Sequence, residues 1–110
     1  MGTVKRTLAN FSFYDQEAIE KHLEQMAARG WRLRKPGSLF WVYEKRNPQK
    51  LRFCVTYFPG ASELDPRPSE RQLEKEDFCV QDGWTLVARW DSMVIFCTDK
   101  EDAVPIDTDP

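Results

Sequence analysis

The sequence predicts an α+β fold in which two strand–helix–strand–strand pseudo-repeats form a largely antiparallel sheet with two helices on one face. Two observations support this prediction. The motif Gly-Trp-x-Leu occurs at residues 30–33 and again at 83–86, and an aromatic residue, Tyr43 or Phe96, follows each glycine by 13 positions. A helical pattern precedes each motif, and apolar runs typical of strands follow it.

The 110 residues fit one domain, and a hydrophobic content of 41% with 13% aromatic residues argues against intrinsic disorder. We divide the chain by its turn and charge patterns. The expected parts are a first repeat at 1–58, a connecting loop at 59–69, a second repeat at 70–98, and an acidic tail or edge strand at 99–110.

The first repeat is expected to open with a strand at residues 3–9, followed by a helix that begins after Asp15 as a candidate N-cap. The apolar residues of this helix recur at helical spacing, at Ile19, Leu23, Met26 and Ala27. Turns at Pro36-Gly37-Ser38 and Asn47-Pro48 then separate three expected strands at 31–34, 39–45 and 51–58.

The second repeat follows a loop that is rich in proline. Ser69 and Gln72 match the capping box, which predicts a helix that ends at Gly83. A second hairpin is expected after this helix, with strands at 84–90 and 93–99. Pro105 excludes a central strand position for the C-terminal segment, because proline has no N–H for a ladder hydrogen bond.

The paired glycines and tryptophans are interpreted as structural. Gly30 and Gly83 are each expected to end a helix in a left-handed conformation. Trp31 and Trp84 are then expected to fill the gap between helix and sheet at the start of each hairpin.

Three predicted strands carry large apolar residues on both faces, in the runs LFWVY, FCVTYF and MVIFC. Two helices on one face cannot cover that much apolar surface. The remainder is expected to be covered by curling of the sheet, by a second copy of the chain, or by a ligand.

This surplus suggests a candidate ligand-binding or partner-binding site. Trp41 and Tyr43 are expected to share a sheet face with Tyr57 or Phe58 on a neighbouring strand, close to Arg34 or Arg52. Aromatic rings beside arginine suit a planar anionic ligand, and they equally suit a protein interface. These aromatic residues would also simply fill the core of a curled sheet.

Catalytic and metal-binding patterns are not recognisable in the sequence. The single histidine, His22, is expected on the polar face of the first helix, and the three cysteines have no metal-ligand spacing. We therefore expect no enzyme activity, no metal and no cofactor.

The net charge of −2 disfavours nucleic acid as a partner, although residues 30–52 are locally basic. Without a signal peptide or a long apolar run, a cytoplasmic location is expected.

The run from Phe11 to Lys45, with its Phe13-Tyr14-Asp15 start, its helix and its Gly-Trp-x-Leu motif, resembles the uncharacterised bacterial family called domain of unknown function 2812. The motif at Gly83 with Phe96 resembles the second half of that family, so the resemblance covers about residues 8–100. It implies no catalytic residues. Many members continue into C-terminal membrane helices and some are encoded beside PadR-like repressors, which implies sensing or regulation. This sequence ends instead in the acidic run EDAVPIDTDP.

Taken together, these features favour a non-enzymatic binding or protein-interaction module, with a regulatory or sensory role. A protein partner or a homodimer is expected to cover its aromatic sheet face. The alternative hypothesis is a protein that senses or sequesters a small, nucleotide-like anion through the same residues.

Overall fold

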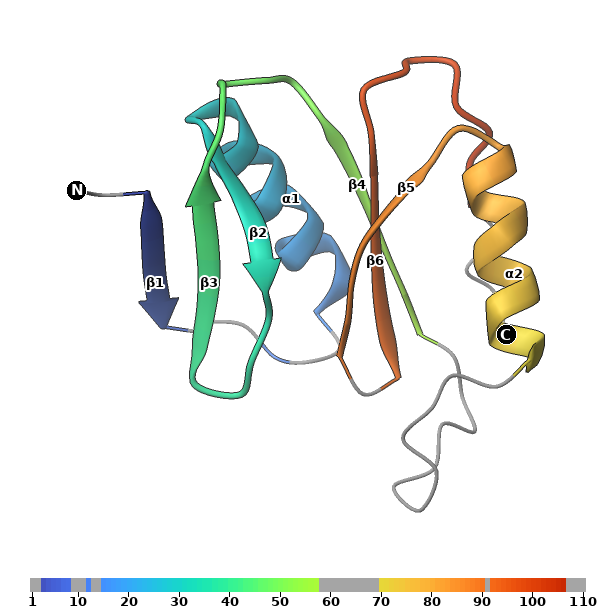
Figure 1. Cartoon of the computed structure of the whole chain (residues 1–110), viewed down its shortest axis with the longest axis horizontal. Coiled ribbons are helices and arrows are strands. Elements are labelled where there is room, and N and C mark those ends of the chain that lie inside the picture. The colour runs from blue at the N-terminus through green and yellow to red at the C-terminus, as the bar shows by residue number, and fades with distance from the viewer. Residues whose placement is uncertain (1–2, 9–11, 13–14, 58–69, 91, 107–110) are drawn as a thin grey trace.

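The computed structural model describes residues 3–8, 12, 15–57, 70–90 and 92–106, and Figure 1 shows the arrangement of their helices and strands. Each half contains a strand, a helix and a hairpin, so the α+β class and the two pseudo-repeats are confirmed. The first repeat comprises β1 (Val4–Leu8), α1 (Gln16–Ala28), β2 (Trp31–Lys35) and β3 (Phe40–Lys45). The second comprises β4 (Arg52–Tyr57), α2 (Glu70–Gln81), β5 (Thr85–Trp90) and β6 (Met93–Thr98).

The described strands form two antiparallel sheets of three strands each, ordered β1-β3-β2 and β4-β6-β5, which corrects the expectation of one sheet. One physical reason lies at the outer edge of β4. There the backbone N–H of Val55 donates to the Glu20 carboxylate at 2.7 Å, and that of Phe53 donates to Glu24 at 3.1 Å. Because these edge groups are already bonded to α1, another strand cannot pair with β4 at these positions.

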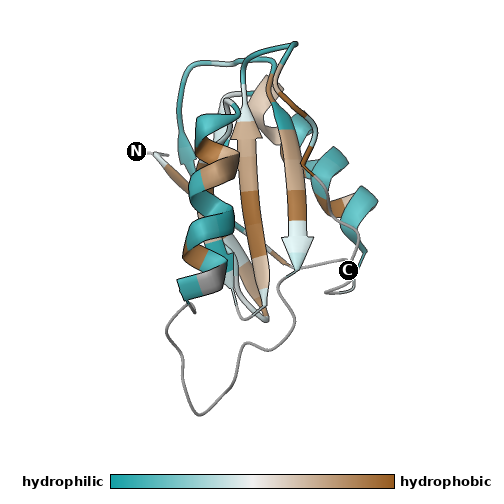
Figure 2. Cartoon of the chain, turned by 90° about the vertical axis from the view of Figure 1, so that its right-hand side faces the viewer, coloured by the Kyte–Doolittle hydropathy of each residue, from teal (hydrophilic) through white to brown (hydrophobic). Residues whose placement is uncertain are grey.

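The helices consequently do not share one face of a sheet. α1 contacts both β2 and β4 and lies between the two sheets, whereas α2 packs beside β5 on the far side of the second sheet (Figure 1). Figure 2 views the molecule from the α2 side and shows hydrophilic and apolar residues mixed along α2, beside strands that are largely apolar.

The two repeats match in detail within the helix and the hairpin. Each β-bulge falls at the same point, between Leu33 and Lys35 in β2 and between Leu86 and Ala88 in β5, positions that are 53 residues apart. Gly30 and Gly83, also 53 residues apart, have φ angles of +91° and +102°. The prediction that these glycines end the helices in a left-handed conformation is therefore confirmed.

Two clusters form the core. The main cluster lies between α1 and the inner faces of both sheets, and it contains Ile19, Leu23, Trp41, Tyr43, Phe53, Val55, Met93 and Ile95 among others. A smaller cluster beneath α2 contains Trp84, Val94, Phe96 and Ala103. Since neighbouring residues of β6 point into different clusters, both faces of the second sheet are covered within the chain.

Several local expectations are refined by the structure. Asp15 occupies the N-cap position of α1, but its side chain makes no capping bond; its backbone carbonyl accepts from Ile19 N–H at 3.0 Å. Ser69, the first residue of the expected capping box, lies outside the described residues. Residues 99–106 form no strand and instead pack as a tail, with the Trp84 indole N–H donating to the Val104 carbonyl at 2.7 Å.

Replacing either glycine with alanine is expected to destabilise the fold, and Gly30→Ala more than Gly83→Ala. A Cβ at Gly30 would lie 2.8 Å from the Arg46 backbone oxygen, whereas at Gly83 the nearest atom is 3.5 Å away on the Lys100 side chain. Both changes incur the left-handed backbone cost of about 1–2 kcal/mol, and Gly30→Ala adds a clash with rigid backbone. Urea unfolding of both variants measures the difference, and equal losses would contradict the assigned close approach at Gly30.

Candidate interaction surface

One face of the first sheet is exposed and apolar. Trp41 and Tyr43 of β3 point into the core, so Phe40 and Val42 point to the opposite face. The strand register places Arg6 opposite Val42 and Leu8 opposite Phe40 on that same face, with Val4 at its end. Relative exposure is 44% for Val4, 61% for Leu8 and 48% for Phe40. We call this surface the open face and define it by Val4, Arg6, Leu8, Phe40 and Val42.

The corresponding face of the second sheet is fully buried. Met93 and Ile95 stand 53 positions after Phe40 and Val42, and both have 0% relative exposure within the main cluster. α1 and the first sheet cover them. The same side of the same structural unit is thus covered in one repeat and, in the part of the chain described here, exposed in the other.

The open face and its rim are positively charged. Arg6 and Lys35 are exposed on strands that flank Val42 in the register. The one acid of the same face of β3, Glu44, is engaged by Arg46 at 3.0 Å. An acidic or amphipathic partner would therefore be favoured over a basic one.

The edge strand β1 has backbone N–H groups that point away from β3 beside this face. Lys45 N–H donates to the Thr3 carbonyl at 2.8 Å, and the alternation of antiparallel bonding then turns the N–H groups of Val4 and Arg6 away from β3. In β4, the two N–H groups with the equivalent orientation belong to Phe53 and Val55, which bond to α1.

The structure places two of the predicted site residues in the core. Trp41 is 1% exposed and Tyr43 is 0% exposed, which corrects the expectation that they form an accessible stacking surface. Trp41 packs edge-to-face on Trp90 at 6.2 Å, and His22, expected on the polar face, packs edge-to-face on Tyr43 at 6.1 Å. Burial, partly offset by the Thr7 hydroxyl, raises the pKa of Tyr43 to about 12.

The other predicted residues do not gather around this pair. Tyr57 packs against the main cluster, and Arg34 is exposed at the bulge of β2. Arg52 belongs to the other sheet, where its guanidinium lies 5.5 Å from the Trp84 ring and donates to the Glu101 carbonyl at 3.1 Å. The described residues therefore form no common aromatic and arginine surface for a planar anion.

A match to a protein-family model decides the family. The model described as "Protein of unknown function (DUF2812)" matches residues 15–110. The chain belongs to this family. No curated protein and no solved structure matches it. In the described part of this DUF2812 protein, no helix combines the length and apolar character that crossing a bilayer requires.

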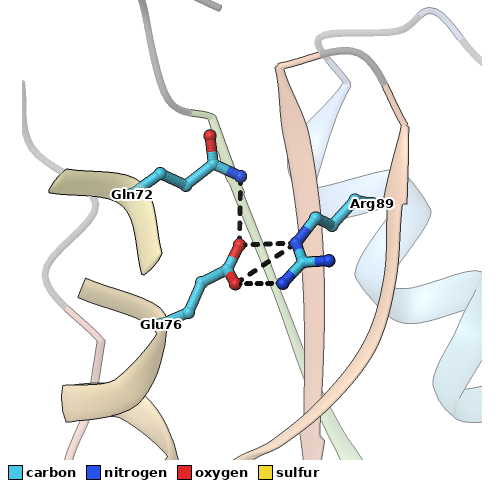
Figure 3. Close-up of polar contacts among 3 residues, drawn as sticks. All are labelled: Gln72, Glu76 and Arg89. Atoms are coloured by element: carbon cyan, nitrogen blue, oxygen red, sulfur yellow. Dashed lines mark hydrogen bonds and ion pairs between the residues drawn. The ribbon is translucent and has the colours of Figure 1, made fainter. Parts of the chain in front are cut away.

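A buried polar cluster under α2 of the DUF2812 chain was not foreseen from the sequence. Arg89 of β5 donates to the Glu76 carboxylate through Nε at 2.9 Å and through a terminal nitrogen at 2.6 Å, and Gln72 donates to it at 3.0 Å (Figure 3). Burial alone would raise the pKa of Glu76, but the bonds from Arg89 and Gln72 outweigh it and lower that pKa. We interpret the cluster as structural, because the Glu76 carboxylate accepts hydrogen bonds from both Arg89 and Gln72.

The thiol groups have properties of structural rather than nucleophilic cysteines. Burial raises the pKa of Cys54 to about 12 and raises the pKa values of Cys79 and Cys97, so the reactive thiolate is disfavoured at neutral pH. Within the described residues, no three His, Cys, Asp or Glu side chains come together in a way that suits a metal ion.

Glu20→Gln is expected to keep or slightly increase stability at pH 7, by under about 1 kcal/mol. Burial raises the pKa of Glu20 above its ordinary 4.5, the Val55 N–H opposes the rise, and Glu24 and Glu17 add to it. The ionised carboxylate therefore carries a cost that is present above the folded-state pKa and is gone once the pH falls below about 4.5. The amide oxygen of glutamine still accepts from the Val55 N–H, so the variant keeps the hydrogen bond. Since Glu20 is itself uncharged in acid, the stability advantage of Glu20→Gln should vanish there.

Comparison of Glu20→Gln with Glu20→Ala measures the contribution of the hydrogen bond to stability. Glu20→Ala removes the acceptor from Val55 N–H and should cost about 1–2 kcal/mol, whereas Glu74→Gln on the exposed side of α2 should change stability by at most about 0.5 kcal/mol. Urea unfolding at several pH values measures all three. A Glu20→Ala variant as stable as the Glu20→Gln variant at pH 7 would contradict a role for this bond at the β4 edge.

Arg89→Ala is expected to destabilise the chain by about 2 kcal/mol, less than for a fully buried pair, because Arg89 is partly exposed. The loss arises because Glu76, 4% exposed, keeps its charge without its main partner. The first repeat supplies the control, since Ile19 and Leu23 occupy the positions equivalent to Gln72 and Glu76. Combining Gln72→Ile, Glu76→Leu and Arg89→Met should restore most of the stability in a thermal melt. A triple variant less stable than Arg89→Ala would show that the cluster does more than fill space.

Proposed function

We propose that this protein is a non-enzymatic interaction module that binds a polypeptide through the open face of its first sheet. The observation that supports this most directly is the contrast between the repeats. Phe40 is 48% exposed, whereas Met93, the residue at the same position of the second repeat, is 0% exposed. An exposed sheet face that combines apolar side chains with charged ones is typical of a protein-binding site.

The chemistry of the open face suits an amphipathic helix better than a small molecule. It is an exposed sheet surface beside the outward-pointing N–H groups of β1, and its exposed charged residues Arg6 and Lys35 are basic. The alternative of an anion sensor that uses Arg34, Arg52, Trp41 and Tyr43 would require the buried pair of aromatic residues to become accessible. Three cysteines that form no disulfide are typical of a reducing compartment, which supports a location in the bacterial cytoplasm.

Site-specific photo-cross-linking in cells tests this proposal. Benzoylphenylalanine placed at position 8 or 40 should cross-link to a polypeptide on irradiation, because those side chains would lie inside the interface. The same group at Thr85, exposed on β5 of the other sheet, is the matched control and should give at least about tenfold less product. Absence of any polypeptide adduct at both open-face positions would overturn the proposal.

A further inference from the structure

We propose that the partner of the open face is α2 of a second copy of this chain, so that copies associate head to tail. This inference rests on the proposed function, and it adds the identity and orientation of the partner. The chain contains its own example of the contact. In the second repeat, the face equivalent to the open face is covered by a helix, α1, which also bonds the adjacent strand edge through Glu20 and Glu24.

One side of α2 is exposed, and it corresponds to the side of α1 that makes that contact. Leu73, Asp77 and Val80 stand 53 positions after Glu20, Glu24 and Ala27 of α1. All three are exposed, with 45% for Leu73 and 50% for Val80. On this side α2 therefore exposes two apolar side chains and a carboxylate. The equivalent positions of α1 include the two glutamates that accept hydrogen bonds from the β4 edge.

The two surfaces complement each other in polarity and charge. Leu73 and Val80 match the apolar residues of the open face, and Asp77 is placed like the carboxylate that accepts from a strand-edge N–H in the α1 contact. Exposed α2 residues near them are acidic, at Glu70 and Glu74, while the open face carries Arg6 and Lys35. Opposite charges favour this pairing over face-to-face association of two basic sheets.

Because the two surfaces differ, the contact is heterologous. Each copy presents one open face and one exposed side of α2, so the association continues into a ring or an open chain rather than stopping at a symmetric pair. Within one copy the layers follow the order sheet, helix, sheet, helix. This contact would continue the same order into the next copy.

Analytical ultracentrifugation of the purified chain tests the inference. The wild type should show a mass that rises above that of the monomer between low and high micromolar concentration. The open-face variant Leu8→Lys/Phe40→Lys and the α2 variant Leu73→Lys/Val80→Lys should each weaken self-association by at least about 100-fold. Gln25→Lys, at an exposed position of α1 outside both surfaces, should associate like the wild type.

Mixing the two defective variants gives the decisive result. The α2 variant retains an intact open face and the open-face variant retains an intact α2, so an equimolar mixture should form a dimer and nothing larger. A failure of the mixture to dimerise, or an α2 variant that associates like the wild type, would overturn the head-to-tail arrangement. A chain that stays monomeric while position 40 cross-links a different protein would overturn only this inference and leave the proposed function standing.

Discussion

The contact between α1 and the edge of β4 determines how the rest of the molecule is arranged. Glu20 and Glu24 lie one helical turn apart, and they accept from the N–H groups of Val55 and Phe53, which are two residues apart on one strand edge. This pairing ends the second sheet at β4 and fixes α1 against both sheets. It also requires a hydrogen-bond acceptor at a half-buried position, since aliphatic side chains would leave edge N–H groups without acceptors. The helix of the first repeat thereby becomes part of the core of both repeats.

The position of each helix explains why the two repeats differ in chemistry despite matching backbones. α1 has sheets on two sides, so its inward positions carry Ile19 and Leu23. α2 touches a single sheet, and its equivalent positions carry Gln72 and Glu76, which form a polar cluster with Arg89. A buried carboxylate of this kind requires a charged partner, and the partly exposed Arg89 provides one beside the peripheral helix. The same backbone unit therefore tolerates a polar interior at the end of the molecule and not at its centre.

The sequence predicted the features that are encoded locally. Gly30, Gly83 and the residues around them specify helix ends and hairpin starts through backbone conformation, and these were confirmed. The division into two sheets depends on helix side chains meeting a strand edge about 30 residues away, and Glu20 and Glu24 look like ordinary solvent-facing residues in the sequence. Strand alternation likewise showed that β3 has two apolar faces without indicating which face is buried. The interior assignment of Trp41 and Tyr43, and hence the location of the open face, needed the three-dimensional arrangement.

The exposure of the open face follows from a shortage of helices. Two sheets have four faces, and the described residues form two helices: α1 covers the inner faces of both sheets, and α2 with residues 99–106 covers the outer face of the second. The fourth face is the open face, where Val4, Leu8 and Phe40 are exposed. Proteins built from stacked repeats commonly end in units whose outer surface is polar, because a terminal unit otherwise exposes what an internal one buries. The first repeat carries exposed apolar residues at positions that an internal unit would bury, and α2 carries exposed apolar residues at the opposite end. The sheet at one end thus lacks a covering helix, and the helix at the other end lacks a second sheet to pack against.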